Sequence, residues 1–185
     1  KDLLPPSSIT PDTRLVLVNA LYFKADWMDK FDKGRTRDDD FETAPGTKVK
    51  VPMMTKTHHY RYTETADAQV LELAYRGAPV AMTIVLPTAR DGLAKLEAAL
   101  SPAMLEGWVS ALASARVQVR LPRFKVESAF ELSRALGALG MTDALDAKKA
   151  DFSGMDGTKE LFIGGVIQKT FCAVDEAGTE AAAAT

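Results

Sequence analysis

The stretch RLVLVNALYF, residues 14–23, is a nearly unbroken apolar run rich in valine and leucine. Such a run is typical of a central β-strand covered on both faces, because neither face then needs polar side chains to meet water. We expect this segment deep in a sheet, with a neighbouring strand along each edge. The sequence offers few long strands to supply those neighbours, and this mismatch indicates part of a larger domain.

The composition fits a globular domain and excludes several classes of partner. The chain has 185 residues, of which 46% are hydrophobic, enough for a sizeable core. Its 23 basic and 25 acidic residues leave a net charge of −2, and no segment concentrates Lys and Arg, so nucleic acid is not an expected partner. No stretch approaches the roughly 18 apolar residues of a membrane span, so no membrane partner is expected either. Cys172 is the single cysteine and is expected to be a small buried hydrophobe.

Alternating apolar residues and turn signals outline the strands. Pro45-Gly46 and Arg76-Gly77 are typical turn pairs, which makes the first part a meander of antiparallel strands. The strands expected after the opening run are residues 47–54, 58–65, 68–75, 79–87, 115–126 and 160–174.

Three helices are expected from capping residues and leucine spacing. Asp91 is the expected cap of the first, and Ser101 followed by Pro102 begins the second. Ser128 and Glu131 have the spacing of a capping box before the third, which Gly140 ends. The sum is an α+β protein with at least two antiparallel sheets.

Motifs for catalysis or metal binding are absent from the sequence. His58 and His59 are the only histidines, and consecutive strand residues point to opposite faces, so they cannot jointly hold one metal without a bulge. Residues 38–40, three aspartates, are interpreted as a solvated strand end or turn because acids at alternating ligand spacing are missing. We therefore expect no enzyme, no metal and no cofactor; a hydrolase or metal enzyme using His58 or His59 is the alternative from another class.

The last stretch, DEAGTEAAAAT at residues 175–185, is open to four interpretations on composition alone. It could be a frayed tail, a short helix, an alanine-rich linker, or a working part whose partner sequence is missing.

From NALYFKADW at residues 19–27 onward, the chain resembles a serpin. The matching motifs follow in the order in which the family has them: Phe31, VPMM at 51–54, LELAY at 71–75, IVLP at 84–87, LPRF at 121–124, ALGALGM at 135–141, ADFSGM at 150–155, VIQK at 166–169 and the stretch at 175–185. The resemblance implies an inhibitory, bacterial-type member with the serpin fold, a large mixed central sheet plus smaller antiparallel sheets with packed helices. It also implies that residues 1–185 are a partial domain, the second half up to the reactive-loop hinge, and that the missing remainder of the same polypeptide is a partner.

The resemblance implies a mechanism as well. In an inhibitory serpin, a serine or cysteine protease attacks an exposed loop, and the cut loop then inserts as a new strand in the large sheet and distorts the protease. This implies a target serine or cysteine protease as partner and favours a secreted or extracellular protein. The alternative within the family is a non-inhibitory serpin acting as carrier or chaperone.

The resemblance makes residues 175–185 the hinge of that loop. Their side chains show whether the hinge could insert as a strand. With a period of two, Thr179, Ala181, Ala183 and Thr185 share one face, while Glu180, Ala182 and Ala184 share the other. If the first set turns inward, no large or charged side chain has to enter the packed sheet. Gly178 is expected to supply backbone freedom where the loop becomes a strand.

Other positions are assigned only through the family register. Glu176 and Arg123 match an acid and a base that pair at the top of the sheet, the breach, and Trp27 matches the tryptophan beside them. Asn19 matches the asparagine of the central shutter, and Gln168 replaces its usual histidine partner. Glutamine can both donate and accept, so the shutter hydrogen bond can persist without the pH response of histidine.

Overall fold

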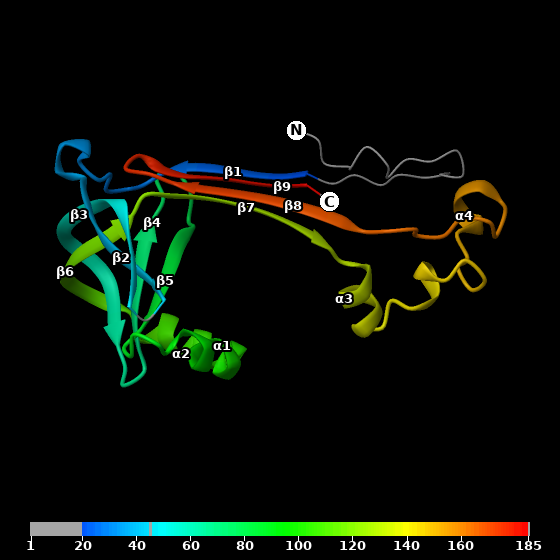
Figure 1. Ribbon diagram of the computed structural model, residues 1–185, viewed down its shortest axis with the longest axis horizontal. Coiled ribbons are helices and arrows are strands. Elements are labelled where there is room, and N and C mark those ends of the chain that lie inside the picture. Colours follow the sequence, from blue (N-terminus) through cyan, green and yellow to red (C-terminus); the bar gives the residue numbers. More distant parts are fainter. Residues whose placement is uncertain (1–19, 45, 185) are drawn as a thin grey trace. The chain divides into compact units, whose positions relative to one another are not determined.

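The computed structural model describes residues 20–44 and 46–184 (Figure 1). The chain divides into two compact units. The first comprises Lys1–Phe23, Lys125–Ala173 and Glu180–Thr185, and the second comprises Lys24–Phe124 and Val174–Thr179.

An antiparallel sheet forms the framework of the second unit. Its strands are β2 (Arg37–Ala44), β3 (Thr47–Glu64), β4 (Ala68–Ala74) and β5 (Ala81–Pro87) in that order, with β6 (Ala113–Pro122) paired to β3. The expectation of two strands at 47–54 and 58–65 is wrong, because β3 is one strand of 18 residues. Its pairing with β6 continues from Met53 to Tyr62 and keeps the intervening residues extended.

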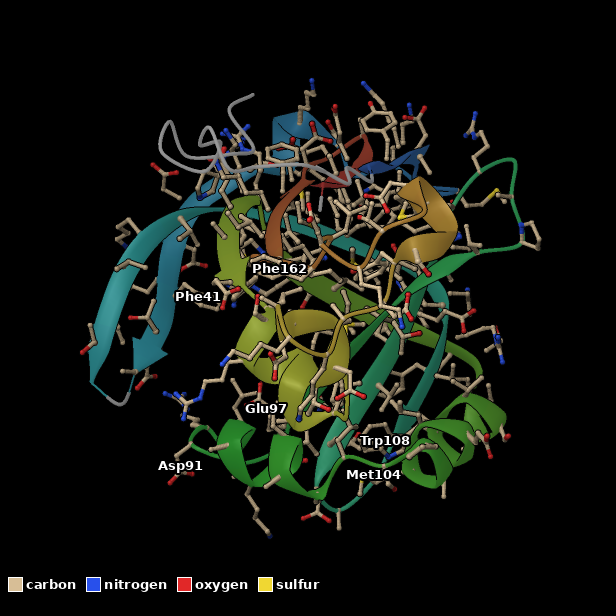
Figure 2. The ribbon with its side chains drawn as sticks, turned by 90° about the vertical axis from the view of Figure 1, so that its right-hand side faces the viewer. Phe41, Asp91, Glu97, Met104, Trp108 and Phe162 are labelled. Carbon is tan, nitrogen blue, oxygen red and sulfur yellow. The ribbon has the colours of Figure 1, made fainter. Side chains whose placement is uncertain are left out.

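Two helices, α1 (Leu93–Ala99) and α2 (Pro102–Ala111), accompany this sheet. The buried cluster comprises Ala68, Val70, Trp108 and Leu112, and the side chains packed against it are Val85, Leu96 and Met104. Trp108 and Met104, both from α2, are labelled in Figure 2. Removing these apolar side chains from water stabilises the unit, at about 25 cal/mol per Å².

The capping predictions have mixed outcomes. Ser101 is confirmed as the cap of α2, since its Oγ accepts a hydrogen bond from the Met104 N–H at 3.3 Å. Asp91 is wrong as the cap of α1, because Gly92 holds that position and offers no side-chain bond.

The helices of the first unit are short. They are α3 (Ser133–Ala138) and α4 (Ser153–Asp156), besides single 3-10 turns at Asp143–Leu145 here and Lys33–Arg35 in the second unit. The capping box at Ser128 is wrong: β7 (Phe124–Glu131) runs through Ser128, and Leu132 is the N-cap residue of α3. Glu131 nevertheless accepts from the Ser133 N–H at 2.9 Å. Gly140, with φ of +105°, follows the end of α3 as expected.

The predicted strand at 115–126 is two strands, β6 and β7, separated at Arg123. Proline 122 has no N–H to donate to a ladder, which favours a break there. The Arg123 N–H donates instead to the Pro52 carbonyl at 2.8 Å. The last predicted strand begins later than expected, because β8 covers Ile167–Val174, in which Cys172 is half-buried rather than buried.

A second sheet has the order β1-β9-β8-β7, where β1 is Ala20–Asp26 and β9 is Gly178–Ala184. Residues 14–19 of the opening run lie outside the described residues, whereas its described part is in β1. Only three residues connect β8 to β9, so these neighbours form an antiparallel hairpin, since a parallel pair needs a long crossover. Residues 178–184 are therefore a strand between β1 and β8, and neither a helix nor a frayed tail.

Candidate functional site

A tight turn at residues 175–177 joins β8 to β9. The Asp175 N–H donates to the Gly178 carbonyl at 3.0 Å. The Asp175 side chain accepts from the N–H groups of Ala177 at 2.8 Å and Gly178 at 3.1 Å. Aspartate is favoured in such turns because its short carboxylate satisfies backbone donors two and three residues on. The hydrogen bonds of Asp175 thus define the turn after which β9 begins.

Trp27, directly after β1, holds this turn through both its backbone and its ring. Its backbone N–H donates to the Ala177 carbonyl and its indole Nε1–H to the Asp175 carbonyl, each at 2.9 Å. Phe31 adds a third bond, from its N–H to the Glu176 carbonyl at 3.0 Å. With 1% of its surface exposed, Trp27 is fully buried, and its ring stacks on Tyr75 at a centroid distance of 4.7 Å.

Glu176 is a buried acid, with 3% of its surface exposed. Its Oε1 accepts from the Thr36 hydroxyl at 2.8 Å and lies 4.0 Å from Nη1 of Arg123, which is half exposed. The structure thus brings together Arg123, Glu176 and Trp27, the three residues assigned to the breach. Burying a carboxylate is unfavourable unless it is paired and hydrogen-bonded, and these contacts supply both.

Two residues of the site carried no assigned role in the sequence. Thr36 follows a 3-10 turn, and nothing in the pattern around it indicates a long-range partner. Tyr75 is the last residue of the LELAY motif, and its hydroxyl donates to Oγ1 of Thr179 at 2.7 Å. Thr179 is 5% exposed, so its side chain faces the interior at the start of β9.

Gly178 is required for a different reason from the one expected. Its φ is not among the positive values, so β9 does not begin with a left-handed residue. A Cβ atom at this position would collide with the Ala25 carbonyl and lie 2.9 Å from the Asp26 Cα. Close approach of two backbones, rather than backbone freedom, selects glycine here.

The remainder of β9 is less sharply divided. Glu180 is half-buried, and its Oε1 accepts from the Tyr22 hydroxyl at 3.0 Å. Residues 181–183, all alanines, are also half-buried, so their exposure does not separate the two predicted faces. The side chain of Ala184 and the whole of Thr185 lie outside the described residues.

The shutter pair is only half described. Gln168 is half-buried within β8, whereas Asn19 lies outside the described residues. The hydrogen bond between Asn19 and Gln168 stays a prediction.

The histidines do not form a site together. His58 Nε2 lies 3.4 Å from Asp29 Oδ2, and the His58 and His59 rings are 6.4 Å apart at 73°. Within residues 20–44 and 46–184, no group of three or more His, Cys, Asp or Glu side chains is placed to hold a metal ion. No helix in this part of the chain is long and apolar enough to cross a membrane.

The family described as Serpin (serine protease inhibitor) matches residues 1–185. Human serpin B3 is 41% identical over 189 residues, covering 100% of this chain and 48% of the relative. Horse leukocyte elastase inhibitor is 42% identical over 192 residues, covering 100% and 51%. The chain spans about half the length of the curated relatives it matches.

Among solved structures, a loop-inserted, cleaved ovalbumin mutant superposes with a TM-score of 0.94 at 29% identity, covering 100% of this chain and 49% of that one. The two chains therefore share one fold.

Proposed function

The chain belongs to the serpin family, and on that premise we propose that the whole protein inhibits serine or cysteine proteases by trapping them covalently. The nucleophile of the protease attacks a peptide carbonyl of the exposed loop, the C–N bond breaks, and the new amine takes up the proton. An acyl bond then joins the loop to the protease. Insertion of the loop into the central sheet follows before water can hydrolyse that bond.

The observation that chiefly supports this proposal is the position of β9. The hinge residues lie as a strand between β1 and β8, which is the place the mechanism requires for the inserted loop. A strand of seven residues with two neighbours makes on the order of ten backbone hydrogen bonds, each contributing a net ~1 kcal/mol. That free energy is available to drive insertion once the loop is cut.

The side chains of the hinge support insertion as well. After Thr179 and Glu180, β9 contains only alanines, which can enter a packed sheet without overpacking it. We propose that insertion begins at the breach, where Trp27 and Glu176 hold the turn, and passes the shutter at Asn19 and Gln168. The protein then needs no catalytic residue of its own, and the remainder of its polypeptide supplies the rest of the domain.

Protease challenge of the whole protein tests the proposal. The protein is incubated with a panel of serine and cysteine proteases and then separated by denaturing electrophoresis. A covalent complex that survives SDS is the expected result. Cleavage of the loop without any such complex contradicts inhibition and favours the non-inhibitory carrier or chaperone.

A substitution in the hinge gives a sharper test. Thr179→Arg places a long charged side chain at a position that is buried against Tyr75, so insertion should slow and the acyl bond should hydrolyse first. We expect the variant to become a substrate, with at least about a tenfold increase in the number of inhibitor molecules consumed per protease, corresponding to about 1.4 kcal/mol.

Glu180→Arg is the matched control. The Glu180 side chain, next to Thr179, is only half-buried and accepts a hydrogen bond from the exposed Tyr22 hydroxyl. It should alter the stoichiometry much less. Equal stoichiometry for Thr179→Arg and the unsubstituted protein would disprove the role of this hinge position.

The bacterial-type assignment stays a prediction, since the relatives described above are from human and horse.

A further inference from the structure

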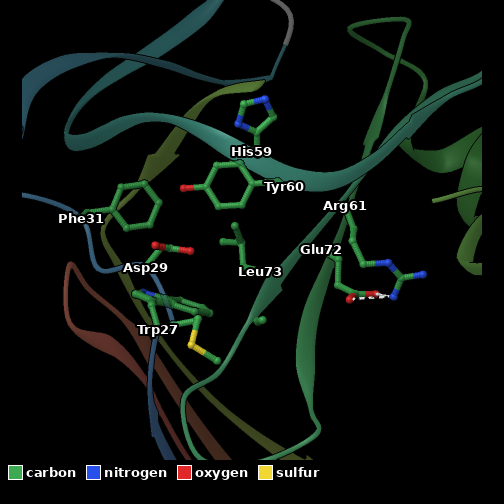
Figure 3. A pocket seen from close by; sticks show the side chains of 10 residues that line it. Trp27, Asp29, Phe31, His59, Tyr60, Arg61, Glu72 and Leu73 are labelled. Carbon is green, nitrogen blue, oxygen red and sulfur yellow. Dashed lines mark hydrogen bonds and ion pairs between the residues drawn. The ribbon is translucent and has the colours of Figure 1, made fainter. Parts of the chain in front are cut away.

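A pocket of about 170 Å³ lies in the second unit, on the side of Trp27 formed by β3 and β4. Its inner wall is apolar and aromatic, with Trp27, Phe31, Tyr60 and Leu73 all at most 8% exposed. Figure 3 shows the Tyr60 hydroxyl pointing toward Phe31, with the Asp29 carboxylate between Tyr60 and Trp27. A pocket of this size suits a single aromatic ring, since a cavity of about 150 Å³ binds benzene in another protein.

Tyr60 presents a hydroxyl to this pocket without a partner. Of the buried side-chain polar atoms in the described residues, its Oη alone has no hydrogen-bond partner. Burial and the nearby charge of Asp29 raise the pKa of Tyr60 to about 12, so the group stays a neutral O–H donor. A buried donor left unsatisfied destabilises a fold by about 1–3 kcal/mol. A ligand that offers a hydrogen-bond acceptor to this hydroxyl would remove that penalty.

Charged side chains also line the pocket and are already paired. Asp29, whose side chain is 39% exposed, lies 3.7 Å from Lys56 Nζ and 3.4 Å from His58 Nε2. Arg61 donates to both carboxylate oxygens of Glu72, at 3.0 and 3.1 Å. The contacts of Asp29 are long and single, which leaves its oxygens able to accept a further hydrogen bond.

We propose that this pocket binds a small, flat, neutral aromatic carboxamide. Its ring lies among the aromatic side chains of Trp27, Phe31 and Tyr60, its carbonyl accepts from the Tyr60 hydroxyl, and its N–H donates to Asp29. Offset or edge-to-face contact with such rings is favourable. An aromatic carboxylate of the same shape lacks the N–H donor and meets the negative charge of Asp29, so it binds more weakly.

Benzamide is the probe that tests this site, with benzoate and toluene as comparison compounds. Binding to the protein is followed by calorimetric titration and by ligand-observed NMR. A probe of this size should bind with a dissociation constant on the order of 1 mM. Benzoate should bind at least about fivefold more weakly than benzamide.

Tyr60→Phe separates the hydroxyl from the rest of the pocket. It keeps the ring and should weaken benzamide about five- to tenfold while leaving toluene unchanged, since only benzamide has an acceptor for the lost hydrogen bond. Tyr62→Phe is the matched control, because the Tyr62 hydroxyl is already bonded to Glu64 at 3.0 Å and does not line the pocket. That substitution should leave the binding of benzamide unchanged.

Two outcomes overturn the proposal: no saturable binding of benzamide, or equal affinity for the unsubstituted protein and the Tyr60→Phe variant. Neither measurement involves a protease, so the site and the inhibitory function stand or fall separately.

Discussion

Trp27 contacts two surroundings of opposite character within one unit. Toward the β8–β9 turn, the polar groups around it are paired: its indole N–H bonds to the Asp175 carbonyl, and the Tyr75 hydroxyl bonds to Thr179. Toward the pocket, the Tyr60 hydroxyl has no partner. Both tyrosines are buried: Tyr60 lies in β3, and Tyr75 directly follows β4 and bridges to Trp27. Only the hydroxyl of Tyr75 has a hydrogen-bond partner.

The difference separates two kinds of design. A network in which every group is satisfied specifies one arrangement, and here it specifies where β9 starts. A buried donor without a partner contributes nothing to that arrangement and is retained only against a cost in stability. We therefore interpret the turn side of Trp27 as structural machinery and the pocket side as a place for an external group.

The largest effect is expected where β9 meets β1. Gly178→Ala adds one methyl group against the Ala25 carbonyl and the Asp26 Cα, and neither backbone atom can move without breaking the sheet. We expect a loss of about 3 kcal/mol or more in the free energy of unfolding. Urea unfolding measures this loss, and amide hydrogen exchange of β9 shows whether the strand still forms.

Gly107→Ala is the control for Gly178→Ala. Gly107 lies within α2 with nothing in the way of a Cβ atom, so alanine should stabilise the protein by about 0.5–1 kcal/mol. If both substitutions proved neutral or stabilising, close approach of the two backbones would not be what selects glycine at position 178.

A smaller effect, which differs between the two sides of Trp27, is expected from removing one hydroxyl. Tyr75→Phe leaves the buried Thr179 hydroxyl without its donor and should destabilise the protein by about 1–2 kcal/mol. Tyr60→Phe removes a group that has no partner and should be neutral or stabilising. Thermal and urea unfolding of both variants measure this difference, and equal losses of stability would contradict the contrast between the two sides.

Much of the fold could be predicted from local patterns, and the misses have physical causes. Residues 68–75 and 79–87 correspond to β4 and β5, because alternation between turn signals is sufficient to mark a hairpin strand. The gap expected at residues 55–57 does not occur, because pairing with β6, which no local pattern reveals, keeps these residues extended within β3. Ser128 lies in a strand for the same reason, although its spacing to Glu131 is typical of a helix cap.

The residues of the candidate site could be predicted only where they match positions of known role in the serpin family. Glu176, Arg123 and Trp27 meet in the structure, but each is separated from the next by many residues and no local pattern links them. Thr36 meets Glu176, and Tyr60 meets the other walls of the pocket, only once the chain has folded, so no local pattern indicates a role for either residue.

The smallest effect concerns alkaline pH and isolates the pocket side. The folded-state pKa of Tyr60 is raised from 10.0 to about 12, so stability from its neutral form is fully present below pH 10 and is lost as pH rises toward 12. Between pH 8 and pH 11 the unsubstituted protein should lose about 1 kcal/mol more than Tyr60→Phe, since one pKa unit corresponds to about 1.4 kcal/mol. Urea unfolding of both proteins at both pH values measures this difference. An identical pH dependence with and without the Tyr60 hydroxyl would mean that this group is not held neutral by the pocket, because its ionisation would then cost the same in the folded and unfolded chain.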